Sequence, residues 1–157
     1  MEKRGVSMTR WIAILVICCT ILGGCSEKTY NPRDIIRETD ICEICNMSIV
    51  HHEYAGQIVL TNGDYKIFDD IGCLMDYLAL NGEEEIGAAY IKNNANNEWI
   101  DIYKATYVYN AGYWTPMNYG VLAFATKDEA QEWMTNEGEG QLLAYQNLLT
   151  FKWGIHE

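Results

Sequence analysis

The stretch that decides the fold is AGQIVLTNGDYKIF, residues 55–68, near the middle of a chain of 157 residues. It contains two short runs rich in β-branched and aromatic residues, at 55–60 and 65–68, and such runs are typical of strands. The Asn62-Gly63 pair between the runs favours a tight turn, because both residues readily adopt positive φ angles. The sequence therefore predicts a β-hairpin here.

A helix is predicted directly after this hairpin. Asp69 or Asp70 can accept hydrogen bonds from the first free backbone N–H groups of a helix. Apolar residues one turn apart then continue to about Leu80, and the glycine at 82 is a common way for a helix to end. Residues 88–91 form a further predicted strand, so the order is strand, strand, helix, strand.

The second half of the chain repeats this order loosely. Residues 107–109 alternate as a strand does, and residues 120–125 form an apolar run typical of a buried strand. Thr126 to Glu129 then has the form of a capping box at the start of a helix. A short apolar segment at 141–144 follows that helix.

These two units predict an α+β protein. We expect two small lobes, each of ββαβ type, at about 40–95 and 96–157. A mature domain of this size fits one domain or two very small lobes.

The N-terminus has the pattern of an export signal. Basic residues at 3, 4 and 10 precede an apolar run at 12–22, and the run ends at Gly23-Gly24-Cys25. The run has about half of the roughly 20 residues that are needed to span hydrocarbon. The sequence Leu-Gly-Gly-Cys at its end looks like a lipobox, the cleavage site of bacterial lipoproteins.

These features predict a lipoprotein anchored in the cell membrane on its extracytoplasmic face, which is the periplasmic side where there is an outer membrane. Residues 1–24 would be a cleaved signal peptide, and Cys25 would carry lipid such as palmitate. Residues 25–39 are mostly polar and contain Pro32, which is typical of a flexible tether. An uncleaved anchor helix is the alternative, and it also places the rest of the chain outside the cytoplasm.

The mature chain is strongly acidic. The leader holds three basic residues and one acidic residue, and its removal leaves 8 basic against 21 acidic residues, a net charge of −13. Such a surface repels nucleic acid, so we expect no nucleic-acid partner. The sequence also lacks a nucleophile elbow, a phosphate loop and a His-Glu-x-x-His motif, so we do not expect an enzyme.

Sulfur residues dominate the stretch DICEICNM, residues 40–47. If Cys25 holds lipid, the mature chain keeps the thiols of Cys42, Cys45 and Cys73, an odd number that disfavours a simple disulfide framework. Thiolates and thioethers are soft donors that suit Cu(I). A structural zinc site usually has four Cys or His ligands in two spaced pairs, and the chain has one Cys-x-x-Cys without a second pair.

Cys45, Met47 and Met117 are the predicted copper ligands. In an extended segment Cys45 and Met47 would point to the same side, because side chains alternate along a strand. Met117 lies in a predicted turn, which makes it the best candidate for a third sulfur. Met75 and Met134 lie in helical patterns, where core packing explains them better.

Four further residues near the predicted site keep two interpretations each. His51 and His52 either complete the metal site or lie on the surface. Cys42 either joins the site or forms a disulfide with Cys45. Cys73 is either a buried free thiol or an auxiliary ligand. The alternative function is an extracytoplasmic thiol-disulfide oxidoreductase that uses Cys42 and Cys45, although such a motif normally opens a helix after a strand.

The chain resembles the NosL family of lipoproteins. The resemblance rests on the lipobox at Cys25, the triplet Cys45-Asn46-Met47 in place of the family's Cys-Gly-Met, the histidine that follows, the stretch Phe68-Asp69-Asp70 before a helix, and residues 115–124, TPMNYGVLAF. It covers essentially the whole mature domain.

This resemblance implies a Cu(I)-binding metallochaperone that supplies copper to nitrous-oxide reductase, an enzyme of denitrification, and works with an ABC-type transporter. It also implies a two-lobed fold of repeated ββαβ units. Cys45, Met47 and Met117 match the family's proposed ligand positions, and His52 or His51 matches a less certain histidine. Asn46 departs from the family's glycine and removes some backbone freedom between the two sulfurs.

Overall fold

The first half of the chain folds into a four-stranded antiparallel sheet with a helix on one face. The structure is a computed structural model and describes residues 28–152. A short 3-10 helix, η1, precedes the sheet. The elements are η1 (His52–Tyr54), β1 (Gly56–Leu60), β2 (Tyr65–Phe68), α2 (Ile71–Asn81), β3 (Ile86–Lys92) and β4 (Trp99–Asp101).

The hairpin of β1 and β2 confirms the prediction from the Asn-Gly pair. Val59 lies opposite Tyr65, and Gly63 has a φ of 99°, in the region that favours glycine. The Asn62 side-chain oxygen accepts a hydrogen bond of 2.9 Å from the backbone N–H of Asp64. This local bond holds the turn closed.

Helix α2 begins and ends where its sequence signals predict. The Asp70 carboxylate accepts a hydrogen bond of 3.1 Å from the backbone N–H of Cys73, so Asp70 is the N-cap. At the other end, the N–H of Gly82 donates to the carbonyl of Leu78 at 2.9 Å. The buried side of the helix, which includes Leu74, packs on β1 and β2.

The second half repeats the architecture of the first. Its elements are β5 (Thr106–Tyr109), β6 (Val121–Phe124), α3 (Lys127–Glu137), β7 (Gln141–Ala144) and the short α4 (Tyr145–Leu148). The strand order β6-β5-β7 matches β2-β1-β3 in the first sheet. Thr126 caps α3 by accepting a hydrogen bond from the N–H of Glu129 at 3.2 Å. The predicted repeat of ββαβ units is therefore confirmed.

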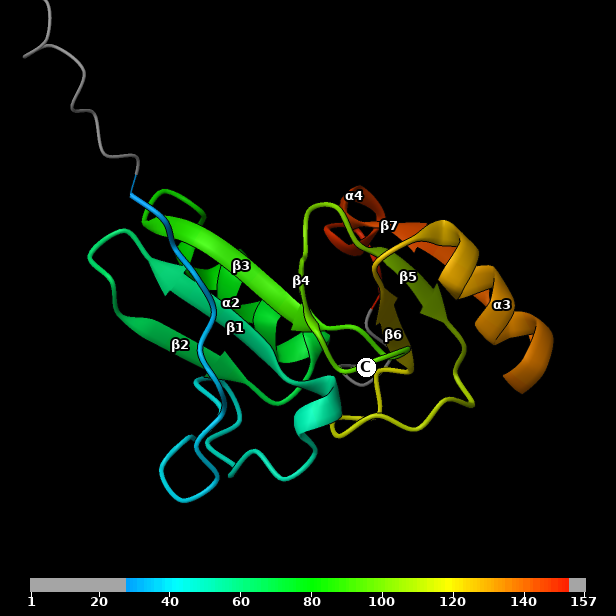
Figure 1. Cartoon of the computed structure of the whole chain (residues 1–157), viewed down its shortest axis with the longest axis horizontal. Coiled ribbons are helices and arrows are strands. Elements are labelled where there is room, and N and C mark those ends of the chain that lie inside the picture. The colour runs from blue at the N-terminus through cyan, green and yellow to red at the C-terminus, as the bar shows by residue number, and fades with distance from the viewer. Residues whose placement is uncertain (1–27, 153–157) are drawn as a thin grey trace, which may run out of the picture.

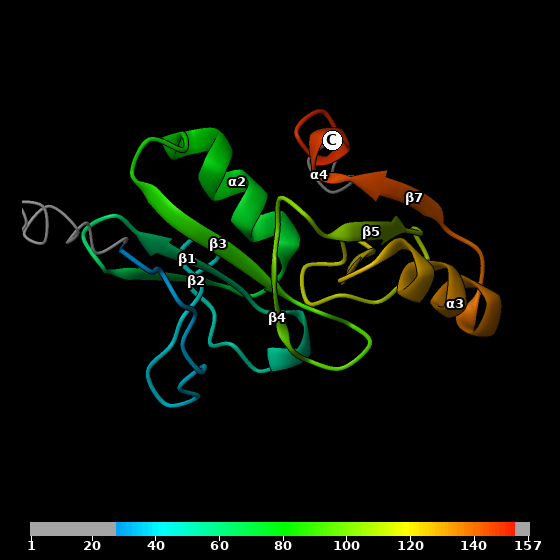
Figure 2. The same ribbon diagram turned by 45° about the horizontal axis from the view of Figure 1, so that its top comes forward.

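The two lobes lie side by side and share one hydrophobic core (Figure 1). Buried side chains continue from Leu74 and Ile91 in the first lobe to Tyr107, Val121 and Leu148 in the second. A smaller cluster of buried side chains packs between α3 and the second sheet. Helix α3 lies on the side of that sheet away from α2 (Figure 2). Because the main core is continuous, the lobes are held together by burial of apolar surface.

Strand β4 belongs to the first lobe. It pairs with β3, with Lys92 opposite Trp99, and the Lys92 ammonium lies 4.2 Å from the centroid of the Trp99 ring. The first lobe therefore extends to Asp101, beyond the boundary predicted near residue 95. A strand of three residues is too short to have a recognisable sequence pattern. It forms because the neighbouring strand β3 pairs with it.

The chain before residue 40 is held against the sheet from Tyr30 onward. The backbone N–H of Arg33 donates to the Gln57 side-chain oxygen at 2.7 Å, and the Gln57 amide donates back to the Arg33 carbonyl at 3.1 Å. The Tyr90 hydroxyl donates to the carbonyl of Tyr30 at 2.7 Å. This segment crosses the face of the sheet opposite α2 (Figure 1). These hydrogen bonds attach Tyr30 and Arg33, within the predicted tether, to the sheet.

The predicted signal peptide and the predicted lipidation site, Cys25, lie outside the described residues. Within residues 28–152, none of the helices has the length and apolar character that crossing a membrane requires.

Candidate metal site

A tight loop carries Cys42 and Cys45. The N–H of Cys42 donates to the carbonyl of Met47 at 2.8 Å, and the N–H of Asn46 donates to the carbonyl of Cys42 at 3.0 Å. The N–H of Glu43 then donates to the carbonyl of Ile67 at 2.9 Å, which fixes the loop to the end of β2. The Cys42–Met47 loop is thereby placed beside the start of α2.

The segment between the two predicted sulfur ligands is not extended. Asn46 has a φ of 59°, in the left-handed region, and the chain turns at this residue. Cys45 is half-buried, whereas Met47 is 47% exposed. The condition under which Cys45 and Met47 would point to the same side, an extended segment, is therefore not met here. Asparagine is among the few residues other than glycine that tolerate this conformation. Asn46 can therefore form this turn in place of the glycine in the Cys-Gly-Met triplet named above.

Three cysteine sulfurs meet at the N-terminal end of α2. The sulfurs of Cys42, Cys45 and Cys73 all lie within 4.8 Å of one another, and all three thiols are free. Cys42 and Cys73 are 0% and 1% exposed. We call this group the cysteine cluster. A metal with sulfurs at about 2.3 Å in a plane would hold them about 4 Å apart, so the cluster has the dimensions of a three-sulfur metal site.

The hydrogen bonds within the cysteine cluster shift the pKa values of its three thiols in different directions. A hydrogen bond from the Cys73 thiol and several from backbone N–H groups lower the pKa of Cys42 to about 5 despite its burial. Donating this bond raises the pKa of Cys73, as burial also does. Burial, with the neighbouring Cys42, raises the pKa of Cys45 to about 11. The hydrogen bonds and burial thus favour the thiolate form at Cys42 and the protonated form at Cys45 and Cys73.

Two carboxylates lie beside the cluster. Burial raises the pKa of Asp69 to about 6, and the charge of Cys42 adds to the shift while His51 opposes it. Burial also raises the pKa of Asp70 to about 6, against hydrogen bonds from the N–H groups of Cys73 and Met117. The Asp69 and Asp70 carboxylates and the Cys42 sulfur give this end of α2 a negative charge, which attracts cations.

The Met117 turn from the second lobe is docked on the same end of α2. The N–H of Met117 donates to Asp70 Oδ2 at 3.1 Å, while Asp70 Oδ1 caps the helix at Cys73. Gly72 permits this approach, because a Cβ at this position would collide with the ring of Tyr119. One carboxylate thus fastens the Met117 turn and the helix turn that carries Cys73.

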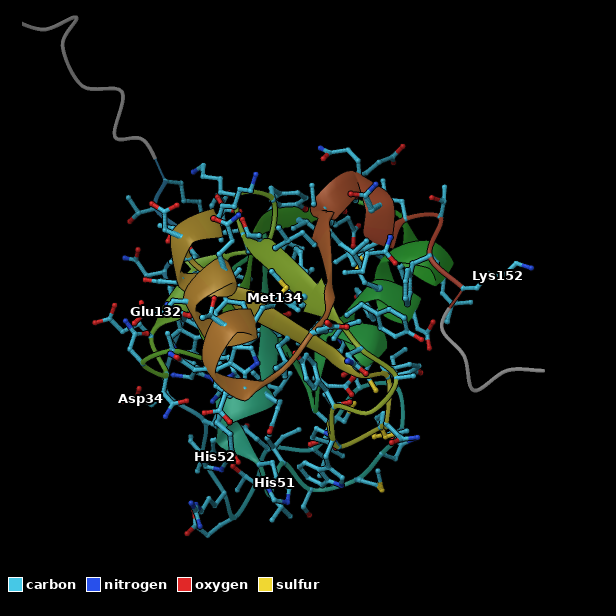
Figure 3. All side chains as sticks on the ribbon, turned by 90° about the vertical axis from the view of Figure 1, so that its right-hand side faces the viewer. Asp34, His51, His52, Glu132, Met134 and Lys152 are labelled. Atoms are coloured by element: carbon cyan, nitrogen blue, oxygen red, sulfur yellow. The ribbon has the colours of Figure 1, made fainter. Side chains whose placement is uncertain are left out.

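The two histidines have different neighbours. His51 packs edge-on against Trp114, with ring centroids 4.7 Å apart, and its Nδ1 lies 3.2 Å from a carboxylate oxygen of Glu53. His52 Nε2 lies 3.1 Å from the carbonyl oxygen of Ile49. Since His51 also influences the pKa of Asp69, His51 is the histidine on the side of the cysteine cluster. His51 directly precedes η1 and His52 is its first residue, so the two histidines lie next to each other just before β1 (Figure 3).

The two methionines assigned to packing both pack against apolar side chains, as predicted. Met75 is buried against the shared core. Met134 packs in the small cluster beneath α3, well away from His51 and His52 (Figure 3).

Cys73 is one of the residues whose role the sequence left open. The available signal was a cysteine in the first turn of a helix, three residues after its Asp70 cap. What the sequence could not show is that the Cys42–Met47 loop packs on that turn, because this contact joins segments about thirty residues apart.

The fold and this site define an α+β protein of two ββαβ repeats with a sulfur-rich site suited to a soft metal ion. A model of the NosL family matches residues 34–150. The crystal structure of the copper chaperone NosL from Shewanella denitrificans superposes with a TM-score of 0.64 at 18% sequence identity, over 76% of this chain and 96% of that one. The comparison with curated protein sequences gave no match.

The family model covers most of the chain, so the protein belongs to the NosL family. The superposition confirms the fold that the resemblance implied.

Proposed function

We propose that this protein is a Cu(I)-binding lipoprotein metallochaperone, and that it supplies copper for assembly of the copper centres of nitrous-oxide reductase. Its cargo would be one Cu(I) ion held through Cys45, with Met47 and Met117 as further donors and His51 or His52 in a supporting role. The protein itself would catalyse no reaction.

The observation that carries this proposal is the gathering of three cysteine sulfurs at the helix end where the Met117 turn is docked. The backbone of Met117, from the second lobe, is hydrogen-bonded to Asp70 at the same helix end as the three cysteine sulfurs, which supports Met117 as a further donor. Thiolate and thioether ligands favour Cu(I) over harder metals. A solved structure with the same fold is that of a copper chaperone.

The site suits a carrier because one side of it is open. Met47 is exposed and Cys45 is half-buried, so an incoming donor can reach them before the other ligands leave. The direct recipient would be the reductase, its ABC-type maturation transporter, or both.

The oxidoreductase alternative has one favourable feature, the pKa of about 5 at Cys42. A redox cysteine of low pKa must also be accessible to its substrate. Cys42 is 0% exposed, so a protein disulfide cannot reach its sulfur in this conformation. This burial favours metal binding over disulfide exchange.

The proposal is tested by titrating reduced protein with Cu(I) against a competing chelator. Wild type should bind one equivalent, and Cys45→Ser should weaken binding by more than the roughly 10- to 100-fold that loss of an outer-shell partner costs. In cells that lack the protein, wild type but not Cys45→Ser should restore the copper content of nitrous-oxide reductase. The absence of Cu(I) uptake by wild type would contradict the proposal.

The membrane anchor is a separate part of the proposal. Cys25→Ser should move the protein from the membrane fraction to the soluble fraction, because the lipid would no longer be attached. Mass spectrometry of the N-terminal peptide should show a diacylated Cys25 in wild type. An unmodified Cys25 in membrane-bound wild type would favour an uncleaved anchor helix instead.

A further inference from the structure

We infer that the site has two copper positions that share Cys45. The inner position is formed by Cys42, Cys45 and Cys73, and the outer position by Cys45 with Met47 and Met117. Copper would enter and leave through the outer position and be held in the inner one. This inference rests on the proposed function and describes how the cargo is retained and released.

Burial separates the two positions. Cys42 and Cys73 are 0% and 1% exposed, whereas Met47 is 47% exposed and Cys45 lies between these extremes. An ion bound by the cysteine cluster is therefore out of reach of a partner protein. Cys45 is the cluster sulfur that also reaches the surface, so it connects the interior to the exposed methionine.

The inner position is built before any ion arrives. Its three sulfurs already lie within 4.8 Å of one another. The Cys42 sulfur accepts hydrogen bonds from the Cys73 thiol and from the backbone N–H groups of Ile44, Cys45 and Asp69. These bonds fix the sulfur in place, so little ordering is needed when a metal binds.

The donors also differ in strength. The cysteines bind as thiolates, whose negative charge attracts Cu(I), while methionine thioethers are neutral. The buried cysteine cluster should therefore hold the ion more tightly than the methionine-lined position. Because of this difference in affinity, copper would occupy the outer position only transiently and the inner position at equilibrium.

Transfer between the positions needs no redox chemistry. On entry, Cu(I)–sulfur bonds to Cys42 and Cys73 form as the bonds to Met47 and Met117 break, and the bond to Cys45 persists. Each cysteine that is protonated in the metal-free protein releases its proton to solvent as it binds copper and recovers it when copper leaves. Copper remains in the +1 state throughout.

The two positions predict different effects in two sets of variants. Cys42→Ser and Cys73→Ser remove an inner ligand, so each should weaken Cu(I) binding by about tenfold or more. Met117→Leu should change the affinity by less than about threefold. It should slow the rates of loading and release, and both rates should fall by an equal factor, because loss of an intermediate alters rates and not the equilibrium. Met134→Leu is the matched control and should change neither quantity.

The measurement is Cu(I) competition with a chromophoric chelator, with stopped-flow kinetics of loading and release on the same samples. Either inner variant suffices if the other fails to fold, and serine at 42 can accept the hydrogen bonds that the sulfur accepts now. Unchanged affinity in a folded inner variant, or a tenfold loss of affinity in Met117→Leu, would overturn the two-position arrangement while leaving copper binding intact. A wild type that binds no Cu(I) would overturn the proposed function as well.

Discussion

At the scale of single residues, asparagine sets the backbone next to both candidate methionine ligands. Among the described residues, those other than glycine with positive φ are Asn46, Asn97 and Asn118, and the first and last of these adjoin Met47 and Met117. The sequence showed that Asn46 replaces a glycine of the family. It did not show that the backbone at Asn46 is left-handed, so the extended geometry that was considered for Cys45 to Met47 does not apply.

Substitution of Asn46 tests this conformation. Asn46→Val should lower the free energy of unfolding by about 1–2 kcal/mol, because a β-branched residue is strained at positive φ. Asn46→Gly should be tolerated, with a change below about 1 kcal/mol, since glycine adopts this region freely. Urea denaturation of the reduced, metal-free protein measures both values. Equal destabilisation by the two substitutions would show that φ does not limit this position.

At the scale of elements, local signals predicted the hairpin, both long helices and their repeat. Asp70 and Thr126 cap α2 and α3, and Gly63 and Gly82 have the positive φ angles expected of their turns. Features that depend on contacts between distant segments were missed or left open. Strand β4 forms because β3 offers it an edge, and Cys73 becomes part of a cluster because the Cys42–Met47 loop packs on α2.

The two helix caps provide a matched pair of variants. Asp70→Ala and Thr126→Ala should each destabilise the protein by about 0.5–2 kcal/mol through loss of a capping bond. Only Asp70→Ala should also weaken Cu(I) binding, because Asp70 orders the helix turn that carries Cys73. Urea denaturation and chelator competition measure the two effects. Equal copper affinity in both variants would show that Asp70 acts on stability alone.

At the scale of the whole molecule, the site depends on how the parts dock. The cysteine cluster joins a loop and a helix of the first lobe, and the Met117 turn comes from the second lobe. The sequence identified most members of the site by their chemistry. Their arrangement follows from a core shared by both lobes, which no local pattern encodes.

The segment before the first lobe is docked through an ion pair whose contribution depends on pH. Arg33 donates two hydrogen bonds of 2.7 Å to Asp40, and these hold the pKa of Asp40 below its ordinary value. A lowered pKa stabilises the fold above the unfolded-state pKa of about 3.9, and this stabilisation is lost as the pH falls through the folded-state value.

Arg33→Ala should therefore lower the free energy of unfolding by about 1–3 kcal/mol at neutral pH, with a smaller difference from wild type near pH 3. Arg37→Ala removes the same charge from an exposed position and is the control. Urea denaturation across this pH range measures the difference. A difference that did not change with pH would show that the Asp40 carboxylate does not carry the effect.

The most direct test of the account is X-ray absorption on reduced protein loaded with one equivalent of Cu(I), which counts the atoms bound to the metal. If the cysteine cluster holds the cargo, copper should have three sulfur neighbours at about 2.3 Å, and Cys73→Ser should reduce that number. A copper shell made mainly of nitrogen or oxygen, or one that Cys73→Ser leaves unchanged, would contradict it.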